Sequence, residues 1–434
     1  MINKVNNFEQ NNLYKNLKKS VKPLDKFIQS QENLSHTRFI QDTVTNWVPK
    51  ALFARSIADF GDMSFLEFLE SGIFYFAPPL IGEFLLRRKM LPKIVPDKIT
   101  KNPHLTDSLE NILNNKGLQK GGINKKIIAA KTALVVGCTC VPVAEYMLSF
   151  AKNLFTLKVF KKSNFDNIAN LDKTNKEDAE QQKRVERNAK KNLKKGTLLS
   201  LGGFAAAAVI AAYGHKSDIA QKLFKTILEP ADLVTKVFPK IKGSKFDKFL
   251  HEYTKLDFDS KDGKLVLSKG QLALTAISGL FGYSEAAKDR GKLDFLEVWT
   301  RVPLVVFYTI FGSSIFDYAF KKYLIRNNKF PDLIQKTSSG DMHIPSRKEL
   351  PDIAQSIAKN KNLNPQDVMN RLVKEKAVVT AVPYAFALLF MGFSLAAITR
   401  LWTQVRYNQQ TKKYAGKAQP FVKPSFTAFY NKKV

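Results

Sequence analysis

The stretch FLEFLESGIFYFAPPLIGEFLLRRKML, from Phe65 to Leu91, has an acidic start, an apolar centre with two prolines and a basic end. A similar stretch, FLEVWTRVPLVVFYTIFGSSIFDYAFKKYLI, runs from Phe295 to Ile325. Without gaps, the alignment pairs Asp59, Gly61, Phe65, Leu66, Glu67 and Gly82 with Asp289, Gly291, Phe295, Leu296, Glu297 and Gly312. A four-residue gap, about one helical turn, then aligns EFLLRRKML with DYAFKKYLI. The pattern predicts an internal duplication; chance similarity between two amphipathic segments is the alternative.

The start of each copy has the residue types of a helix N-terminus. A glycine interrupts the pattern just before Ser64 in the first copy and Asp294 in the second. Glu67 and Glu297 follow three positions later, as in a capping box. This spacing satisfies free N–H groups at a helix start and needs no catalytic interpretation.

The end of each copy carries an acid four residues before a base. Glu83 precedes Arg87, and Asp317 precedes Lys321, which is the favourable orientation on one helix face. Near a membrane interface, a carboxylate paired in this way costs less than an isolated charge at mid-bilayer. We therefore interpret these four residues as structural ion pairs.

Six apolar blocks dominate the chain, at 72–86, 127–151, 196–214, 270–287, 302–320 and 377–399. Two of them, 196–214 and 377–399, hold no charge and match the roughly 20 residues that cross about 30 Å of hydrocarbon. A buried core helix of a large soluble domain is the alternative, but such helices usually have a polar face. The sequence therefore predicts an all-α, helical integral membrane protein made of two related units.

The number of membrane crossings stays open between four and six. Pro78, Pro79 and Pro303 interrupt the first and fifth blocks, which could be kinked, re-entrant or in-plane segments. If all six blocks cross, positive charge divides evenly between the two sides, so the positive-inside rule gives no orientation. The two units would then be parallel.

The formal charge of +31 points to an anionic partner, either phospholipid head groups or nucleic acid. The sequence has no zinc-finger spacing and no signature of an RNA-binding sheet, so anionic lipid is the simpler partner for a chain with apolar blocks. The Lys-rich run that starts at Lys176 predicts an exposed helix continuing into the third block, with Glu186 paired to Lys190. The sequence does not identify a protein partner.

The predicted organisation follows the distribution of polar residues. We expect two short helices after Ser346, the second beginning at Asn364-Pro365. The N-terminus has no apolar core of signal-peptide length, so no cleaved signal is expected. The segments are a polar, disordered arm (1–44), a first membrane unit (45–214), a polar connection (215–264), a second membrane unit (265–408) and a basic flexible tail (409–434).

No constellation of residues predicts a catalytic, cofactor or metal site. The five histidines are scattered through polar connections, and Cys138 and Cys140 lie in an apolar block as small packing residues. The chain has no P-loop, nucleophile elbow or zinc-protease motif. The remaining candidates are ionisable residues within or beside the blocks, where Lys131 and Glu145 can extend toward the interface. This set of candidate polar residues is Glu67, Glu83, Arg87, Lys131, Glu145, Glu297, Asp317 and Lys321.

These features predict a non-enzymatic, multi-pass membrane protein with a structural, scaffolding or partner-binding role. Its basic connections would bind anionic lipid head groups. The alternative is a small-solute transporter or channel built from two parallel repeats, favoured by the duplication and by the acids within the blocks. A third class, an enzyme acting on lipid at the interface, would have to use Glu67 and Glu297.

Overall fold

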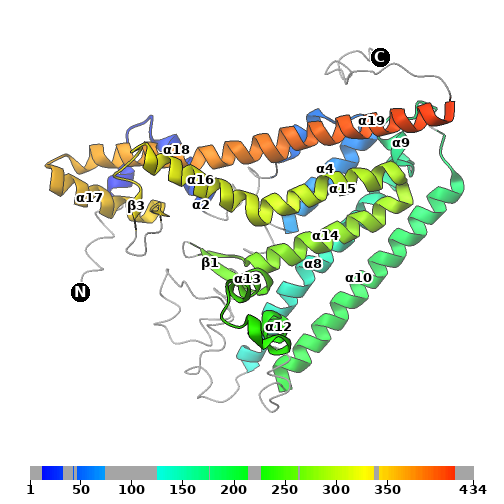
Figure 1. Cartoon of the computed structure of the whole chain (residues 1–434), viewed down its shortest axis with the longest axis horizontal. Coiled ribbons are helices and arrows are strands. Elements are labelled where there is room, and N and C mark those ends of the chain that lie inside the picture. The colour runs from blue at the N-terminus through cyan, green and yellow to red at the C-terminus, as the bar shows by residue number, and fades with distance from the viewer. Residues whose placement is uncertain are drawn as a thin grey trace. The chain divides into compact units, whose positions relative to one another are not determined.

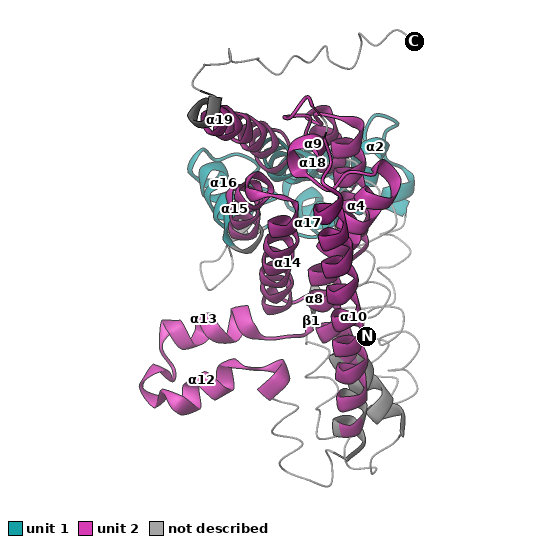
Figure 2. Ribbon diagram, turned by 90° about the vertical axis from the view of Figure 1, so that its right-hand side faces the viewer, with its two compact units in different colours: residues 1–38, 311–389 teal, residues 39–310, 390–434 magenta. Residues whose placement is uncertain are grey.

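Helices make up most of the part of the chain that the structure describes, which confirms the all-α class (Figure 1). The computed structural model describes residues 12–32, 43, 46–73, 125–174, 176–213, 226–261, 264–336 and 342–415. The strands in these ranges form two short antiparallel hairpins, β1 (Phe258–Lys261) with β2 (Lys264–Leu267) and β3 (Gln335–Lys336) with β4 (Met342–His343). The chain divides into two compact units (Figure 2), residues 1–38 with 311–389 and residues 39–310 with 390–434.

The first unit packs four helices around one apolar core. They are α2 (Lys22–Glu32), α16 (Ser313–Arg326), α17 (Leu350–Lys361) and α18 (Pro365–Ala387). The side chain of Asn364 accepts the backbone N–H of Gln366 at 2.8 Å, so α18 begins at Pro365 as predicted. α18 is longer than the short helix predicted there, because it continues into the sixth apolar block.

Residues 12–32 belong to this core, so the prediction of a disordered arm is wrong for them. Leu17, Val21 and Ile28 are at most 4% exposed. Ile28 lies on α2, whereas Leu17 and Val21 lie in the turn that precedes this helix. Average composition hides these apolar residues inside a Lys- and Asn-rich segment, which is why the prediction failed.

The second unit is built on three long helices that lie side by side (Figures 1 and 2), α8 (Lys125–Phe160), α10 (Ala179–Tyr213) and α14 (Lys269–Arg290). α8 and α14 approach closely where glycine removes the side chain. A Cβ atom at Gly282 would lie 2.4 Å from the carbonyl oxygen of Tyr146. The packing of α14 on α8 therefore requires glycine at this position.

Four further helices complete this unit at the end where α8 and α14 finish. They are α4 (Ile57–Ser71), the single-turn α9 (Phe165–Ile168), α15 (Lys292–Phe307) and α19 (Leu395–Ala415). α4 packs on α8, and α15 packs on α14, α9 and α19. At the other end, α12 (Ala231–Val237) and α13 (Lys245–Thr254) form a helical hairpin that packs on the start of α14.

α10 begins as a charged helix and continues without a break into the third apolar block, as predicted. Lys190 Nζ lies 2.9 Å from Glu186 Oε1, which confirms that ion pair. The exposed basic residues of its first half are Lys183, Arg184, Arg187, Lys190, Lys191, Lys194 and Lys195. Beyond Gly196, side chains more than half exposed are Leu198, Leu199, Leu201, Phe204 and Val209. The exposed surface of α10 thus changes from basic to apolar at Gly196.

Within the described residues, one helical run, Pro365–Thr411, is long and apolar enough to cross a membrane. Only 17% of its apolar window is buried, and the mean hydropathy of that window is 2.0. These values support membrane association by length and composition. Of the first block, residues 74–86 lie outside the described residues, together with Pro78 and Pro79.

The fifth block is a continuous helix. The helical backbone is unbroken from Lys292 to Arg326, with a π-helical turn at Tyr308–Gly312 that follows Pro303. The block therefore does not turn back on itself, and its irregularity is a local widening of the helix. A second π-helical turn, Leu388–Ser394, follows Pro383 in the same way.

The predicted capping boxes are wrong. α4 begins at Ile57, where Ser56 accepts the N–H of Asp59, and α15 begins after Gly291 without a side-chain cap. Gly61 therefore lies inside α4. A Cβ atom there would lie 2.4 Å from the ring of Phe160, so this glycine serves helix packing.

The C-terminal boundary also differs from the prediction. α19 continues to Ala415, so residues 409–415 of the predicted tail are helical, and the rest of that tail, 416–434, lies outside the described residues. The two compact units do not follow the predicted order of membrane units, because each is assembled from separate parts of the chain.

Candidate functional site

Two helix starts in the second unit carry the same residues at the same spacing. The segments are RSIADFGD, from Arg55, and RGKLDFLE, from Arg290. Each has an arginine before the helix, an aspartate four residues later and a second acid three residues after that. We call Arg55, Asp59, Asp62, Arg290, Asp294 and Glu297, with their partners Lys152 and Arg400, the charge network.

Each arginine of the charge network pairs with an acid of its own segment. Arg55 Nε lies 3.1 Å from Asp59 Oδ2. Arg290 Nε lies 3.0 Å from Asp294 Oδ2, a charge contact without hydrogen-bond geometry. Both pairs have i to i+4 spacing. The two local arrangements are therefore alike.

Each arginine also pairs with an acid of the other segment. Arg55 Nη1 donates to Glu297 Oε2 at 3.1 Å, and Arg290 Nη1 donates to Asp62 Oδ1 at 2.8 Å. α4 and α15 are thus joined by two reciprocal ion pairs.

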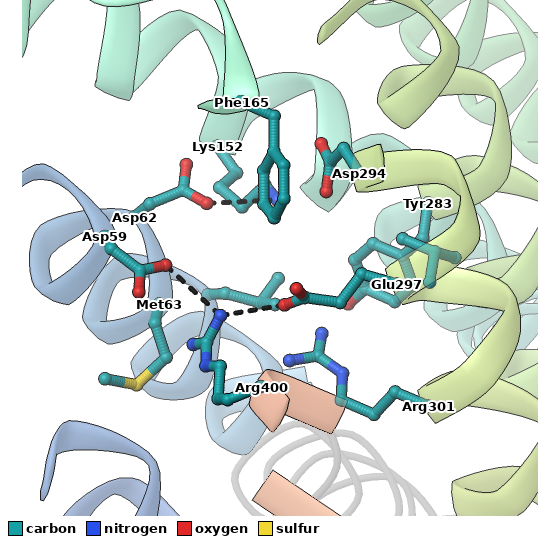
Figure 3. A pocket seen from close by; sticks show the side chains of 12 residues that line it. Asp59, Asp62, Met63, Lys152, Phe165, Tyr283, Asp294, Glu297, Arg301 and Arg400 are labelled. Carbon is teal, nitrogen blue, oxygen red and sulfur yellow. Dashed lines mark hydrogen bonds and ion pairs between the residues drawn. The ribbon is translucent and has the colours of Figure 1, made fainter. Parts of the chain in front are cut away.

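The two distal acids, Asp62 and Glu297, each pair with one further base, Lys152 and Arg400 (Figure 3), and each accepts a hydrogen bond from a threonine. Lys152 Nζ lies 3.2 Å from Asp62 Oδ2, and Thr156 also donates to Asp62. Arg400 Nη1 and Thr403 Oγ1 each donate to Glu297 at 2.7 Å. α8 therefore supplies a base and a threonine to the acid of α4, and α19 supplies the same two residue types to the acid of α15.

Phe165, on α9, lies between the two segments. Its ring centre is 5.1 Å from the guanidinium carbon of Arg55 and 5.9 Å from that of Arg290. Beside it the charge network encloses a cavity of about 30 Å³ (Figure 3). Such a volume accommodates about two water molecules and no larger solute.

Nearly complete burial makes these pairings necessary. Arg290 is 1% exposed and Asp62 is 6% exposed. Burial alone would raise the pKa of Asp62, but Arg290 and Lys152 together hold that pKa below its ordinary value. The carboxyl group is therefore ionised at neutral pH and binds the ends of three helices together.

Residues of the charge network flank five of the apolar blocks in the sequence. Lys152, Arg290 and Arg400 come directly or shortly after the second, fourth and sixth blocks. Asp62 and Glu297 come shortly before the first and fifth. Charged residues that follow three blocks and precede two others in the sequence thus meet in the charge network.

The structure places some of the predicted site residues in this region and leaves others elsewhere. Glu297 belongs to the charge network, whereas Glu67 lies outside it and pairs with Lys50. Asp317 Oδ2 lies 2.6 Å from Lys321 Nζ, which confirms that predicted pair. The backbone of Lys131 lies in α8, and Glu83 and Arg87 are outside the described residues.

Glu145 departs from its prediction. It was expected to extend toward the membrane interface, but it is 2% exposed. Its Oε1 accepts the hydroxyl of Tyr283 at 2.8 Å, and its Oε2 has no hydrogen-bond partner among the described residues. The side chain is held inward because Gly279 leaves room for it on α14, where an added Cβ would lie 3.0 Å away.

The chain matches no protein-family model, and neither the curated proteins nor the solved structures contain a significant match to it. Its function must therefore be argued from its own geometry. Among the described residues, no group of three or more His, Cys, Asp or Glu side chains could hold a metal ion.

The bases of the charge network were not predicted from the sequence. The signal was present as R-x-x-x-D-F-x-[D/E], which occurs at Arg55 and again at Arg290. The FLE alignment obscured it, because matching Phe65 to Phe295 pairs Asp59 with Asp289. In the structure Asp59 has the place of Asp294, and Asp289 instead contacts Asn188 on α10. The correct register is shifted by five residues.

Proposed function

We propose that this chain is a non-enzymatic, multi-pass membrane protein with a scaffolding role, whose second unit is fastened by the charge network at one membrane surface. The observation that carries the proposal is the change of the exposed face of α10 from basic to apolar at Gly196. Basic residues suit an anionic lipid surface, and exposed Leu, Phe and Val suit hydrocarbon.

Along the helices, the change from basic to apolar residues on α10 lies close to the charge network. A Cβ atom at Gly196 would lie 2.4 Å from Met147 Sδ, so Gly196 is level with Met147 on α8. Lys152 follows Met147 by five residues, about 7.5 Å along the helix. The charge network thus lies on the basic side of the change, where head groups and water would be close.

The pairing within the charge network favours a structural role. The acids Asp59, Asp62 and Glu297 each have two basic partners. Buried ion pairs of this kind hold elements in one arrangement, since breaking any of them leaves a buried charge without a partner.

The membrane proposal predicts that anionic lipid stabilises the chain through α10. Phosphatidylglycerol added to protein in neutral detergent should raise the thermal midpoint, because a ligand that binds only the folded state stabilises it. We expect Lys191→Gln, Lys194→Gln and Lys195→Gln together to remove most of this rise, since each basic residue near the surface contributes about 1 kcal/mol. The measurement is a thermal melt at increasing lipid concentration.

The control removes three charges in the first unit, with Lys15→Gln, Lys19→Gln and Lys22→Gln. If it lowers the lipid effect as much as the α10 variant, the effect reflects net charge alone, and α10 is not the lipid-binding surface. If carbonate at high pH releases the parent chain from membranes, it is not an integral membrane protein.

Glu145 supports a second candidate, a proton-coupled transporter built from two related segments. A buried carboxyl group without a basic partner is expensive to ionise, and such groups within apolar helices mark proton paths in transporters. Glu67 and Glu70 place further negative charge near the Glu145 side chain, which opposes its ionisation. The small size of the cavity in the charge network favours the scaffold.

Glu145→Gln distinguishes the two candidates. Glutamine keeps an oxygen for the hydroxyl of Tyr283, so the scaffold proposal predicts an unchanged or higher thermal midpoint and no change in proton leak across reconstituted vesicles. The control Tyr283→Phe should lower the midpoint, because it removes the hydrogen bond to Glu145. A proton flux in the parent chain that disappears in Glu145→Gln would favour the transporter.

A further inference from the structure

The hairpin of α12 and α13 exposes an unusual number of large apolar side chains. Phe246 and Phe249 on α13 stack with ring centres 6.4 Å apart, and Tyr253 continues the same helix face. Side chains at least 40% exposed are Leu233, Val237, Phe238, Phe246 and Phe249. Exposed aromatic residues grouped in this way mark a surface that contacts something apolar.

Lysines accompany this apolar surface. The exposed lysines of the hairpin are Lys236, Lys240, Lys242, Lys245 and Lys248. On α13, Lys245 flanks the face of Phe246 and Phe249, whereas Lys248 lies on the opposite side of the helix. An apolar face bordered by basic residues is typical of helices that lie in the plane of an anionic membrane surface.

The hairpin is held firmly to the rest of the second unit. Leu256 N donates to Leu228 O at 2.7 Å, and both side chains are buried. Lys269, at the start of α14, pairs with Glu252 and lies 5.2 Å from the ring of Tyr253. His251 Nε2 lies 3.1 Å from Asp232 Oδ1, and this contact connects α13 to α12. The apolar surface therefore has a fixed position at this end of α14.

The length of α14 sets the distance between the hairpin and the charge network. The hairpin packs on the start of α14 at Lys269, and the network contains its last residue, Arg290. Twenty-two helical residues span about 33 Å. This length matches the roughly 30 Å thickness of bilayer hydrocarbon. The hairpin and the charge network thus lie one bilayer thickness apart.

We infer that the α12–α13 hairpin lies in the plane of the membrane surface opposite the charge network. Its aromatic face enters the boundary between head groups and acyl chains, and its lysines bind anionic phospholipid. The inference rests on the proposed membrane function and extends it to a specific element and ligand class. Two observations favour lipid as the partner of this apolar face. The lysines that border the face suit anionic head groups, and the face lies at the level of the bilayer surface.

The test measures the depth of the hairpin in the full-length chain. A variant with Cys138→Ser and Cys140→Ser receives one cysteine, by Phe246→Cys, which is labelled with an environment-sensitive fluorophore. The chain is reconstituted into vesicles that carry a nitroxide quencher near the head groups. We expect quenching at least twofold stronger than for the matched control Lys248→Cys, on the opposite side of α13. Val237→Cys supplies an independent second position on α12.

The lysines are tested by lipid composition. In vesicles with about one third phosphatidylglycerol, quenching at Phe246→Cys should exceed that in neutral vesicles, because each lysine strengthens anionic binding about fivefold. Lys240→Gln, Lys242→Gln and Lys245→Gln together should remove this difference.

The outcomes separate this inference from the membrane proposal. A chain that does not incorporate into vesicles overturns both. A chain that incorporates but shows equal quenching at positions 246 and 248 overturns the hairpin inference alone. If the emission of the label is blue-shifted but the lipid nitroxide does not quench it, protein, such as a second copy of the chain, covers this face. That outcome would also overturn the hairpin inference.

Discussion

Replacing Arg290 by methionine is expected to unfold the second unit under conditions where the parent chain is folded. Arg290 is 1% exposed and contacts both Asp62 and Asp294. Methionine fills much of the same volume but leaves these buried carboxylates without their arginine. Removing one partner of a buried ion pair typically destabilises a protein by about 3–5 kcal/mol. A thermal melt in detergent, followed by near-ultraviolet circular dichroism, measures the loss.

Lys288→Met is the matched control, because Lys288 lies two residues earlier on α14 and makes an exposed ion pair with Glu285. It should change the free energy of unfolding by less than about 1 kcal/mol. Adding Asp294→Asn to Arg290→Met should recover part of the stability, because Asp294 then carries no charge, whereas Asp62 keeps Lys152 as its partner. If Arg290→Met melts like Lys288→Met, the charge network does not hold the helix ends.

Gly282→Ala is expected to produce the second largest effect. The new methyl group would lie 2.4 Å from Tyr146 O and 2.9 Å from Tyr146 Cα, so the backbone of α8 or α14 must move. Overpacking of this kind usually costs about 1–3 kcal/mol, and contact with backbone places it toward the upper end. The measurement is the denaturant midpoint of the reconstituted or detergent-solubilised chain.

Gly202→Ala is the control, because a Cβ atom at Gly202 meets nothing within 4 Å. Gly202 lies inside α10, where alanine should stabilise the helix by about 0.5–1 kcal/mol. The two glycine-to-alanine changes should therefore have opposite signs. A stabilising Gly282→Ala would mean that α8 and α14 do not pack this closely.

Local patterns in the sequence predicted the elements that depend on local chemistry. Asn364 begins α18, Lys176 precedes the charged start of α10, and Asp317 pairs with Lys321 as its spacing indicates. In each case the interacting groups are within one or two helical turns, so spacing alone determines the contact.

Features that depend on contacts between distant segments were not predicted. Gly61 looked like a helix interruption because its partner, Phe160, lies on another helix. Leu17 and Ile28 looked solvated because the core that covers them comes from residues beyond 311. Arg55 and Arg290 were overlooked for the same reason, since their cross-pairs join residues more than two hundred positions apart.

The reciprocal ion pairs bear on the ancestry of the chain. Arg55 pairs with Glu297 and Arg290 pairs with Asp62, so the distal acid of each segment is paired with the arginine of the other segment. Two identical chains, each carrying one R-x-x-x-D-F-x-[D/E] segment, would satisfy both acids by meeting face to face in the same way. Such a homodimer needs only one gene, and joining two copies of that gene would preserve every cross-pair within a single polypeptide. In such a fused chain the residues of the cross-pairs would be the most constrained, because changing one of them leaves a buried charge without its partner.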